Sequence, residues 1–198
     1  NEMTILQIQP EIHDENRIIS GEKIVLAYKN NELKNYPKTF DLIYQGVLGT
    51  IVHHYLEHGE FSPSHLTVET RLKEKGVPSK LLKSFTNSIL DILSKTKHDN
   101  NFEWIFKYRD STEVEAEYRG ARQSVIIDRL FIDDGILWII DFKTASLNKD
   151  ETLDEFKERQ KLSHQSQIEK YKEVLNDFFD LPSRAAIYCP AESQLIMV

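Results

Sequence analysis

The sequence has 198 residues, of which 40% are hydrophobic and 29% charged, which fits one domain with a hydrophobic core and excludes a wholly disordered chain. No apolar run approaches the ~18 residues of a membrane span, and the first residues lack the basic and apolar parts of a signal peptide. The formal net charge of −7 argues against a protein that simply coats DNA, and the single cysteine, Cys189, excludes an internal disulfide, so we expect a cytoplasmic protein without a membrane partner.

The first half of the sequence predicts helices. Apolar residues at helical spacing predict a helix over 47–56, which His58-Gly59 would end. A second helix is expected over 79–93, with Ser79 as a possible N-cap. The polar segment 95–101 is expected to be a loop.

Strands dominate the second half, because β-branched and aromatic residues become frequent. They are predicted over 112–118, 124–132, 136–142, 184–189 and 194–198. The near-continuous apolar character of the second and third strands predicts that both of their faces are covered. A helix is predicted over 163–179, and the mixed-charge run 148–161 is interpreted as a solvated loop or helix.

These elements predict an α/β fold, with a central mixed β-sheet flanked by helices. We expect a single domain over residues 1–198, with a mainly helical region over 1–95 and the sheet core over 96–198. Because the sequence does not begin with Met, we expect it to be part of a longer protein.

The turn at Asp134-Gly135 places two acidic residues in register. A two-residue type I′ hairpin there sets Asp128 opposite Asp141 on one side of the sheet, with Cβ atoms about 4.5–5.5 Å apart. Lys143 lies two residues beyond Asp141 and therefore points to the same side.

Two interpretations of this pair remain open. Facing like charges destabilise a strand pair, and an unpaired buried carboxylate is unfavourable by several kcal/mol. A divalent cation, Mg²⁺ or Mn²⁺, would resolve the conflict, because hard metals prefer clustered carboxylate oxygens. Alternatively, one aspartate pairs with Lys143 and the other with Arg129 or Arg122, and the hairpin has a purely structural role.

Five short motifs extend the pattern from about Gly46 to the end of the chain. In order they are Gly49–His53 (G-x-x-x-H), Glu115–Tyr118 (E-x-P-F, with Glu117 at the proline position), Ile127–Arg129 (I-D-R), Asp141–Thr144 (D-Y-K-T, with Phe142 at the tyrosine position) and Gln167–Tyr171 (Q-x-x-x-Y). Together they resemble the PD-(D/E)XK nuclease domain of RecB/AddA-type helicase–nucleases, the C-terminal module of a UvrD/Rep-like helicase. The resemblance implies a restriction-endonuclease-like core.

The resemblance also implies roles for individual residues. The implied metal ligands are His53, Asp128, Asp141 and the backbone carbonyl of Phe142, and the implied cofactor is Mg²⁺ or Mn²⁺. Lys143 would activate the attacking water, Gln167 and Tyr171 would contact the substrate phosphate or hold Lys143, and Glu115 would be a supporting acidic residue. The iron–sulfur cluster of one branch of the family needs four cysteines, so none is expected here.

Several of these residues also have plainer interpretations. His53 could be a core histidine at the rim of its helix stripe, and Tyr171 also lies on an apolar stripe. Two of the three glutamates at 113, 115 and 117 could form a solvated face. The remaining histidines outside the motif, His164 among them, are expected at the surface.

The function implied by the resemblance is hydrolysis of DNA in double-strand-break repair and recombination. The substrate would be single strands fed to an exonuclease by a fused ATP-dependent helicase, in an assembly with a second subunit. One alternative is a stand-alone exonuclease of the phage recombination type. Another is a catalytically idle nuclease-like domain that binds DNA or a partner protein.

Overall fold

The computed structural model describes residues 37–121 and 123–198, so most of the expected helical region before residue 37 lies outside the described residues. Contacts within the chain separate residues 38–198 as one unit, which carries every element considered below. Its first helix, α2, spans Pro37–His58. It ends where predicted, because Gly59 adopts a φ of +67°, a left-handed conformation that stops a helix.

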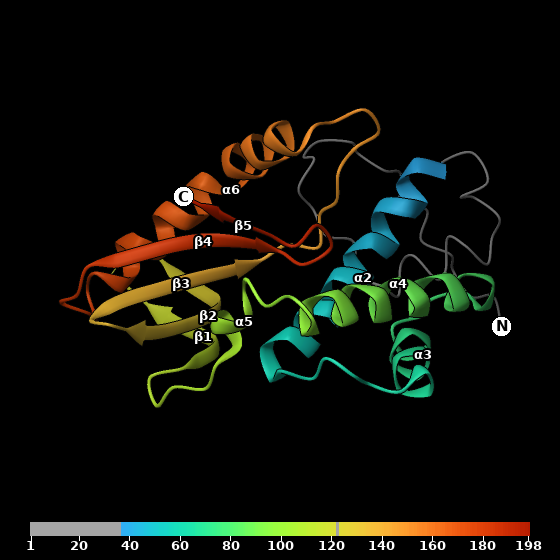
Figure 1. Cartoon of the computed structure of the whole chain (residues 1–198), viewed down its shortest axis with the longest axis horizontal. Helices are drawn as coiled ribbons and strands as arrows, with labels where there is room; N and C mark the ends of the chain where they lie inside the picture. Colours follow the sequence, from blue (N-terminus) through green and yellow to red (C-terminus); the bar gives the residue numbers. More distant parts are fainter. Residues whose placement is uncertain (1–36, 122) are drawn as a thin grey trace, which may run out of the picture. The chain divides into compact units, whose positions relative to one another are not determined.

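Two further helices lie beside α2 (Figure 1): α3 spans His65–Glu74 and α4 spans Ser79–Lys97. The sequence analysis did not predict α3, whose N-cap Ser64 accepts a hydrogen bond from the Thr67 amide. In α4, Ser79 is the first helical residue and not the cap. The predicted loop at 95–101 is wrong for its first residues, because basic residues stabilise the last turn of α4. Among the described residues, no helix has the length and apolar character needed to cross a membrane.

A five-stranded mixed sheet forms the other part of the unit, in the order β1-β2-β3-β4-β5. Its strands are β1 (Glu113–Arg119), β2 (Ser124–Asp133), β3 (Ile136–Phe142), β4 (Ser183–Cys189) and β5 (Gln194–Met197). Neighbouring strands are antiparallel except β3 and β4, which are parallel and joined through α6, Leu153–Leu175. The α/β class with a mixed sheet flanked by helices is confirmed.

The β2–β3 hairpin has the predicted turn and register. Asp133 pairs with Ile136, and the loop residues Asp134 and Gly135 have φ values of +49° and +71°. Two positive φ angles define a type I′ turn, which matches the twist of the strands that it joins. The ladder continues to the pair Arg129 and Ile140, and the next step of the same register leads to Asp128 and Asp141.

Both faces of the central strands are covered, as predicted. On one face α6 packs against β2, β4 and β5, where Ile139 and Ile168 belong to one buried cluster (Figure 1). On the other face the short helix α5, Glu103–Phe106, contributes aromatic rings. Trp104 lies 4.8 Å from Trp138 between ring centroids, and Phe106 stacks on Phe142 at 5.9 Å. These contacts fix the end of β3 from both sides.

Helix α6 starts ten residues earlier than predicted, because Thr152 and Glu155 form a capping box. The mixed-charge run that could have been a loop is therefore largely helical. Phe156 and Gln160 within it are buried, and Arg159 donates to Glu151 at 2.6 Å. The early start makes α6 longer than predicted. Gln167 and Tyr171 lie on the second half of this helix.

Candidate metal and active site

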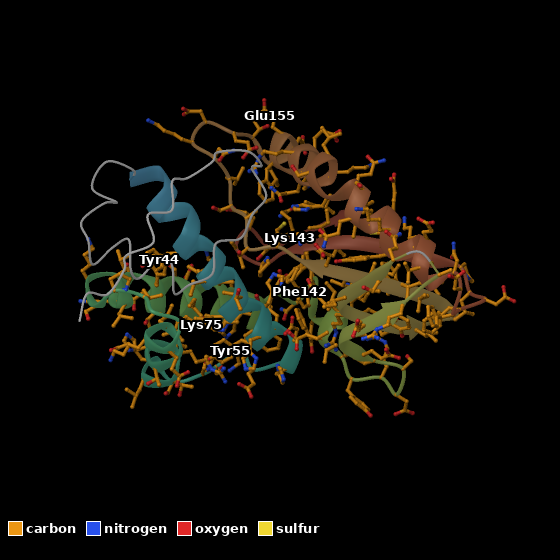
Figure 2. All side chains as sticks on the ribbon, turned by 180° about the vertical axis from the view of Figure 1, so that it is seen from behind. Tyr44, Tyr55, Lys75, Phe142, Lys143 and Glu155 are labelled. Carbon is orange, nitrogen blue, oxygen red and sulfur yellow. The ribbon has the colours of Figure 1, made fainter. Side chains whose placement is uncertain are left out.

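The expected site residues gather where the end of β3 meets α2. Figure 2 labels Phe142 and Lys143 at this junction. Helix α2 can come close because Gly49 has no side chain: a Cβ atom there would lie 3.2 Å from the hydroxyl of Thr144, directly after Lys143. The glycine of the G-x-x-x-H pattern thus permits the approach that brings His53, one turn later, to the sheet.

Asp128 lies at the centre of the site. Its Oδ2 accepts a hydrogen bond of 2.6 Å from the backbone amide of Phe142, just beyond the last ladder pair. The pKa of this carboxyl is raised to about 7, chiefly by burial and secondly by the negative charge of Asp141. The amide hydrogen bond and the positive charge of Lys143 act in the opposite direction. The amide hydrogen bond therefore holds the Asp128 carboxylate in place, but its negative charge is only partly balanced by nearby positive charge.

His53 reaches Asp128 from α2. Its Nδ1 lies 3.6 Å from Asp128 Oδ2, and its ring meets Phe142 edge-on with centroids 6.0 Å apart. Burial lowers the pKa of His53 below its ordinary value, and the charge of Lys143 lowers it further. A neutral imidazole is the form that binds metals. The structure therefore places His53 at the site and not merely in the core.

Glu57 is a site residue that the sequence analysis missed. It lies one turn after His53 on α2 and is only 6% exposed. Burial raises its pKa to about 8, with Glu115 and then Asp128 adding to the rise. A hydrogen bond between the carboxyls of Glu57 and Glu115 requires that one of them carries a proton. The Oε2 atom of Glu57 has no hydrogen-bond partner among the described residues. Its spacing of four from His53 was the available sequence signal.

Asp141 is buried, at 1% exposed, and three side chains surround it. Its Oδ1 accepts hydrogen bonds from Gln167 Nε2 at 3.1 Å and from the Tyr171 hydroxyl at 3.2 Å. Lys143 Nζ lies 2.7 Å from Oδ2, at an angle outside the hydrogen-bond range, so this contact is an ion pair. Gln167 and Tyr171 thus hold the aspartate, whereas the resemblance implied that they hold Lys143 or a phosphate.

Glu115 is the only one of the three β1 glutamates that acts on the site within the described part of the chain. Its φ of +47° is left-handed, and its charge acts on His53, Glu57 and Asp128. All three residues are exposed, but the other two are paired away from the site: Glu113 accepts from Tyr118, and Glu117 accepts from Arg119. The twisted backbone at Glu115 separates it from its neighbours on the strand.

The structural alternative, in which arginine or lysine pairs with each aspartate, is seen for Asp141 and is not seen for Asp128 with Arg129. Asp141 does pair with Lys143. Arg129, however, donates to the backbone carbonyls of Ile105 and Lys107 and makes no ion pair with Asp128. Arg122 lies outside the described residues. Beside Asp128 lie His53 and the backbone amide of Phe142, and no arginine of the described residues pairs with it.

Ligand atoms of His53, Glu57 and Asp128 all lie within 4.8 Å of one another, a spacing that one metal ion could bridge. A neutral imidazole with two carboxylates is a donor set used for divalent cations. The unpartnered Oε2 of Glu57 is a buried acceptor that such an ion would satisfy. These residues therefore fit a divalent cation.

Two features adjoin the site. His164 is half-buried one turn before Gln167, and burial followed by the charge of Lys143 lowers its pKa, so the surface position expected for it is wrong. A cavity of about 600 Å³ borders Thr144 and Ser146, although Asp128, Asp141 and Lys143 do not line it. The cavity therefore adjoins the site residues but does not contain them.

The chain matches no protein-family model, and no curated protein matches it either. What the protein can do is therefore inferred from its own side chains. Their chemistry combines a cluster of one imidazole and two carboxylates that could hold a cation, a buried carboxylate and an adjacent lysine within one junction of the fold.

Proposed function

We propose that this chain is a metal-dependent DNA nuclease domain with a restriction-endonuclease-like core, similar to the nuclease module of RecB/AddA-type helicase–nucleases. The observation that carries the proposal is the convergence of His53 and Asp128 with the Asp141–Lys143 pair, on α2, β2 and β3. His53 comes from a helix far from the hairpin in the sequence, and no structural need explains a partly buried and a buried aspartate at the end of the same hairpin.

The ligands of the cation, Mg²⁺ or Mn²⁺, would come from His53, Asp128, Asp141 and the carbonyl of Phe142, with Glu57 beside them. A bound divalent cation would supply positive charge to a phosphate oxygen and make water a stronger acid. The hydrogen bond that the Phe142 backbone N–H donates to Asp128 and the stacked ring of Phe106 would hold Phe142 in place for this role. Oxygen ligands held in this way need little reorganisation when the cation arrives.

Lys143 is the residue that would act on the reacting groups directly. Its ammonium is 22% exposed and lies against Asp141, so it can reach a phosphate or water while remaining oriented. The aspartate that orients it is itself held by Gln167 and Tyr171. Burial raises the pKa of Tyr171, so its hydroxyl keeps its proton and continues to donate.

The biological setting in the proposal follows from the resemblance. The domain would hydrolyse single strands delivered by a fused helicase during double-strand-break repair and recombination. The acidic charge of −7 is consistent with a module whose partner grips most of the DNA. This setting is carried over by analogy from the family whose motifs the sequence resembles.

The test is cleavage of end-labelled linear DNA, single- and double-stranded, with Mg²⁺, with Mn²⁺ and with EDTA. We expect cleavage that needs the metal, disappears in Asp141→Ala and persists in Asp180→Asn, which removes an exposed carboxylate beyond the end of α6. The substrate that is degraded also gives the strand preference. Folded protein that cleaves neither substrate in either metal would refute the proposal for this chain.

A further inference from the structure

The cavity of about 600 Å³ next to the site has no role in the proposed function. Thr144, the residue directly after Lys143, forms part of its wall. Helix α4, the loop between β3 and α6, and the turn between β4 and β5 supply most of the rest. A volume of this size lies within the ~300–1,000 Å³ of small-molecule sites, so the cavity has room for a ligand.

The loop between β3 and α6 is held in place before any ligand arrives. The carbonyl of Ser146 accepts a hydrogen bond from Arg159 Nη2 at 3.1 Å. The amide of Leu147 donates to Glu192 Oε1 at 3.0 Å, and the amide of Asn148 donates to a carboxylate just before α6 at 2.8 Å. Three consecutive residues without regular secondary structure are thus anchored on both sides of the cavity. A site whose walls are already ordered loses little entropy when a ligand binds.

The charged side chains that line the cavity balance one another among the described residues. Lys95 and Arg159 carry positive charges, and Asp91 and Glu192 carry negative charges in equal number. Lys95 Nζ also lies 3.0 Å from Asp91 Oδ2. A ligand with several phosphates needs an excess of positive charge, which this lining does not provide. The balance favours an uncharged group with polar edges.

The uncharged part of the lining has both apolar and hydrogen-bonding side chains. Leu48 and Ile92 provide apolar surface, whereas Ser88 and Asn148 provide a hydroxyl and an amide. A nucleobase has the matching properties, because its faces stack on apolar groups and its edge carries donors and acceptors. The base and sugar of one nucleotide therefore match the volume, the charge and the chemistry of this cavity.

We propose that the cavity receives the base and sugar of the last nucleotide of a DNA strand, whose phosphate lies at Lys143. The inference rests on the proposed function and adds the position of the strand end. Hydrolysis at this phosphate adds the hydroxide of a water molecule to phosphorus, and the sugar oxygen that leaves takes up the proton. The released fragment is then a single nucleotide, because the strand end lies one nucleotide from the bond that breaks.

The first test is calorimetric binding of deoxyadenosine monophosphate, as the 5′ and as the 3′ isomer, to the wild-type chain with Mg²⁺. We expect one isomer to bind, and the matching deoxyribose phosphate without the base to bind at least ~10-fold more weakly. The isomer that binds also identifies which end of the strand enters the cavity.

Ser88→Trp places an indole in the cavity and should weaken nucleotide binding by at least ~10-fold. Ser84→Trp is the matched control and should bind as the wild type does. Both serines are exposed residues of α4 whose hydroxyls donate to a backbone carbonyl of the same helix, but Ser84 lies outside the lining of the cavity.

The second test is the length of the first fragments released from end-labelled linear DNA. We expect single nucleotides from the wild-type chain and from Ser84→Trp, and longer fragments from Ser88→Trp. The inference is overturned if neither isomer binds, if the base adds nothing to the affinity, if Ser88→Trp binds like the wild type, or if the wild-type chain first releases oligonucleotides.

The wild-type results decide the question even if Ser88→Trp does not fold. They also separate the two proposals. Cleavage without nucleotide binding removes the role of the cavity and leaves the nuclease, whereas nucleotide binding without cleavage does the reverse.

Discussion

The side chain of Asp128 accepts a hydrogen bond from the backbone amide of Phe142, at 2.6 Å. The contact lies one step past the last ladder pair of the β2–β3 hairpin, so a carboxylate from one strand closes the end of its neighbour. Asp128 therefore has two separable properties, its charge and its ability to accept this bond. Substitutions can remove them one at a time.

We expect Asp128→Asn to abolish cleavage while leaving the metal-free fold as stable as the wild type, or more stable. Asparagine keeps an acceptor for the Phe142 amide but removes one of two repelling charges. Asp128→Ala removes the acceptor too and should lower the free energy of unfolding by about 1–3 kcal/mol. Urea unfolding in EDTA measures both variants. A large loss of stability in Asp128→Asn would instead identify the aspartate as a structural ion-pair partner.

The metal-free protein should lose stability as the pH rises from 6.5 to 8. The pKa values of Asp128 and Glu57 are raised to about 7 and about 8 in the folded state, so the folded protein binds more protons than the unfolded chain in this range. His53 has a pKa lowered from 6.5, so its contribution has the opposite sign and offsets the fall only in the lower part of this range, where the unfolded imidazole still binds a proton. The slope should be on the order of 1 kcal/mol per pH unit.

Urea unfolding at several pH values in EDTA tests this dependence. Saturating Mn²⁺ should remove the slope, because the cation replaces the protons. The variant Asp128→Asn combined with Glu57→Gln should remove it without metal. A slope that the double variant leaves intact would assign the effect to other groups.

Lys143→Met should abolish cleavage and destabilise the metal-free fold by about 3–5 kcal/mol. The substitution leaves Asp141, 1% exposed, without its cation, and a buried charge that loses its partner is strongly unfavourable. Adding Asp141→Asn should recover most of the lost stability, because the unpaired charge is then gone. Unfolding free energies of the two single variants and the double variant form a double-mutant cycle. If the loss in the double variant equals the sum of the two single losses, a direct ion pair is contradicted.

Tyr171→Phe should lower the maximal rate of cleavage by about 10–100-fold while changing Mn²⁺ affinity little. The hydroxyl donates to Asp141 Oδ1, which Gln167 also holds, so the aspartate stays in place but less firmly oriented. Tyr118→Phe removes a hydroxyl that donates to the exposed Glu113 and serves as the matched control. Loss of Mn²⁺ binding in Tyr171→Phe would mean that the hydroxyl supports the ligand set itself.

Two glycines of α2 should respond differently to alanine. Nothing lies within 4 Å of a Cβ at Gly46, so Gly46→Ala should stabilise the helix by about 0.5–1 kcal/mol. At Gly49 the Cβ would lie 3.2 Å from Thr144 Oγ1, so Gly49→Ala should gain less stability and reduce cleavage by moving the residue after Lys143. Adding Thr144→Ala should restore the lost stability. Equal gains at both glycines would show that the close approach is unimportant.

The hairpin could be predicted because its determinants are local. Asp134-Gly135 selects the turn, the turn fixes the register, and the register brings Asp128 toward Asp141. The start of α6 was equally local, since Thr152 and Glu155 stand at capping-box spacing, but the charged residues after them obscured it. Such signals act over a few residues and can be recognised from sequence alone.

Glu57 had only a weak local signal, its spacing of four from His53. In the sequence it is otherwise a polar residue near the end of a helix, next to His58, where solvent exposure is the ordinary expectation. Its burial arises from packing against β1 and β2, whose residues Glu115 and Asp128 lie far along the chain. The short aromatic helix α5 was missed for a related reason, since its four residues become helical only against the sheet.

The site draws its side chains from two parts of the chain that are far apart in the sequence and pack against each other in one unit. Asp128, Asp141, Lys143 and Tyr171 all belong to the strands and helix between Ser124 and Leu175, whereas His53 and Glu57 come from α2. A cation bound by both groups would act as a non-covalent cross-link between α2 and the hairpin. Metal supply would then determine how long the two parts stay docked, and a protease would cut the segment after Gly59 faster in EDTA than in Mn²⁺.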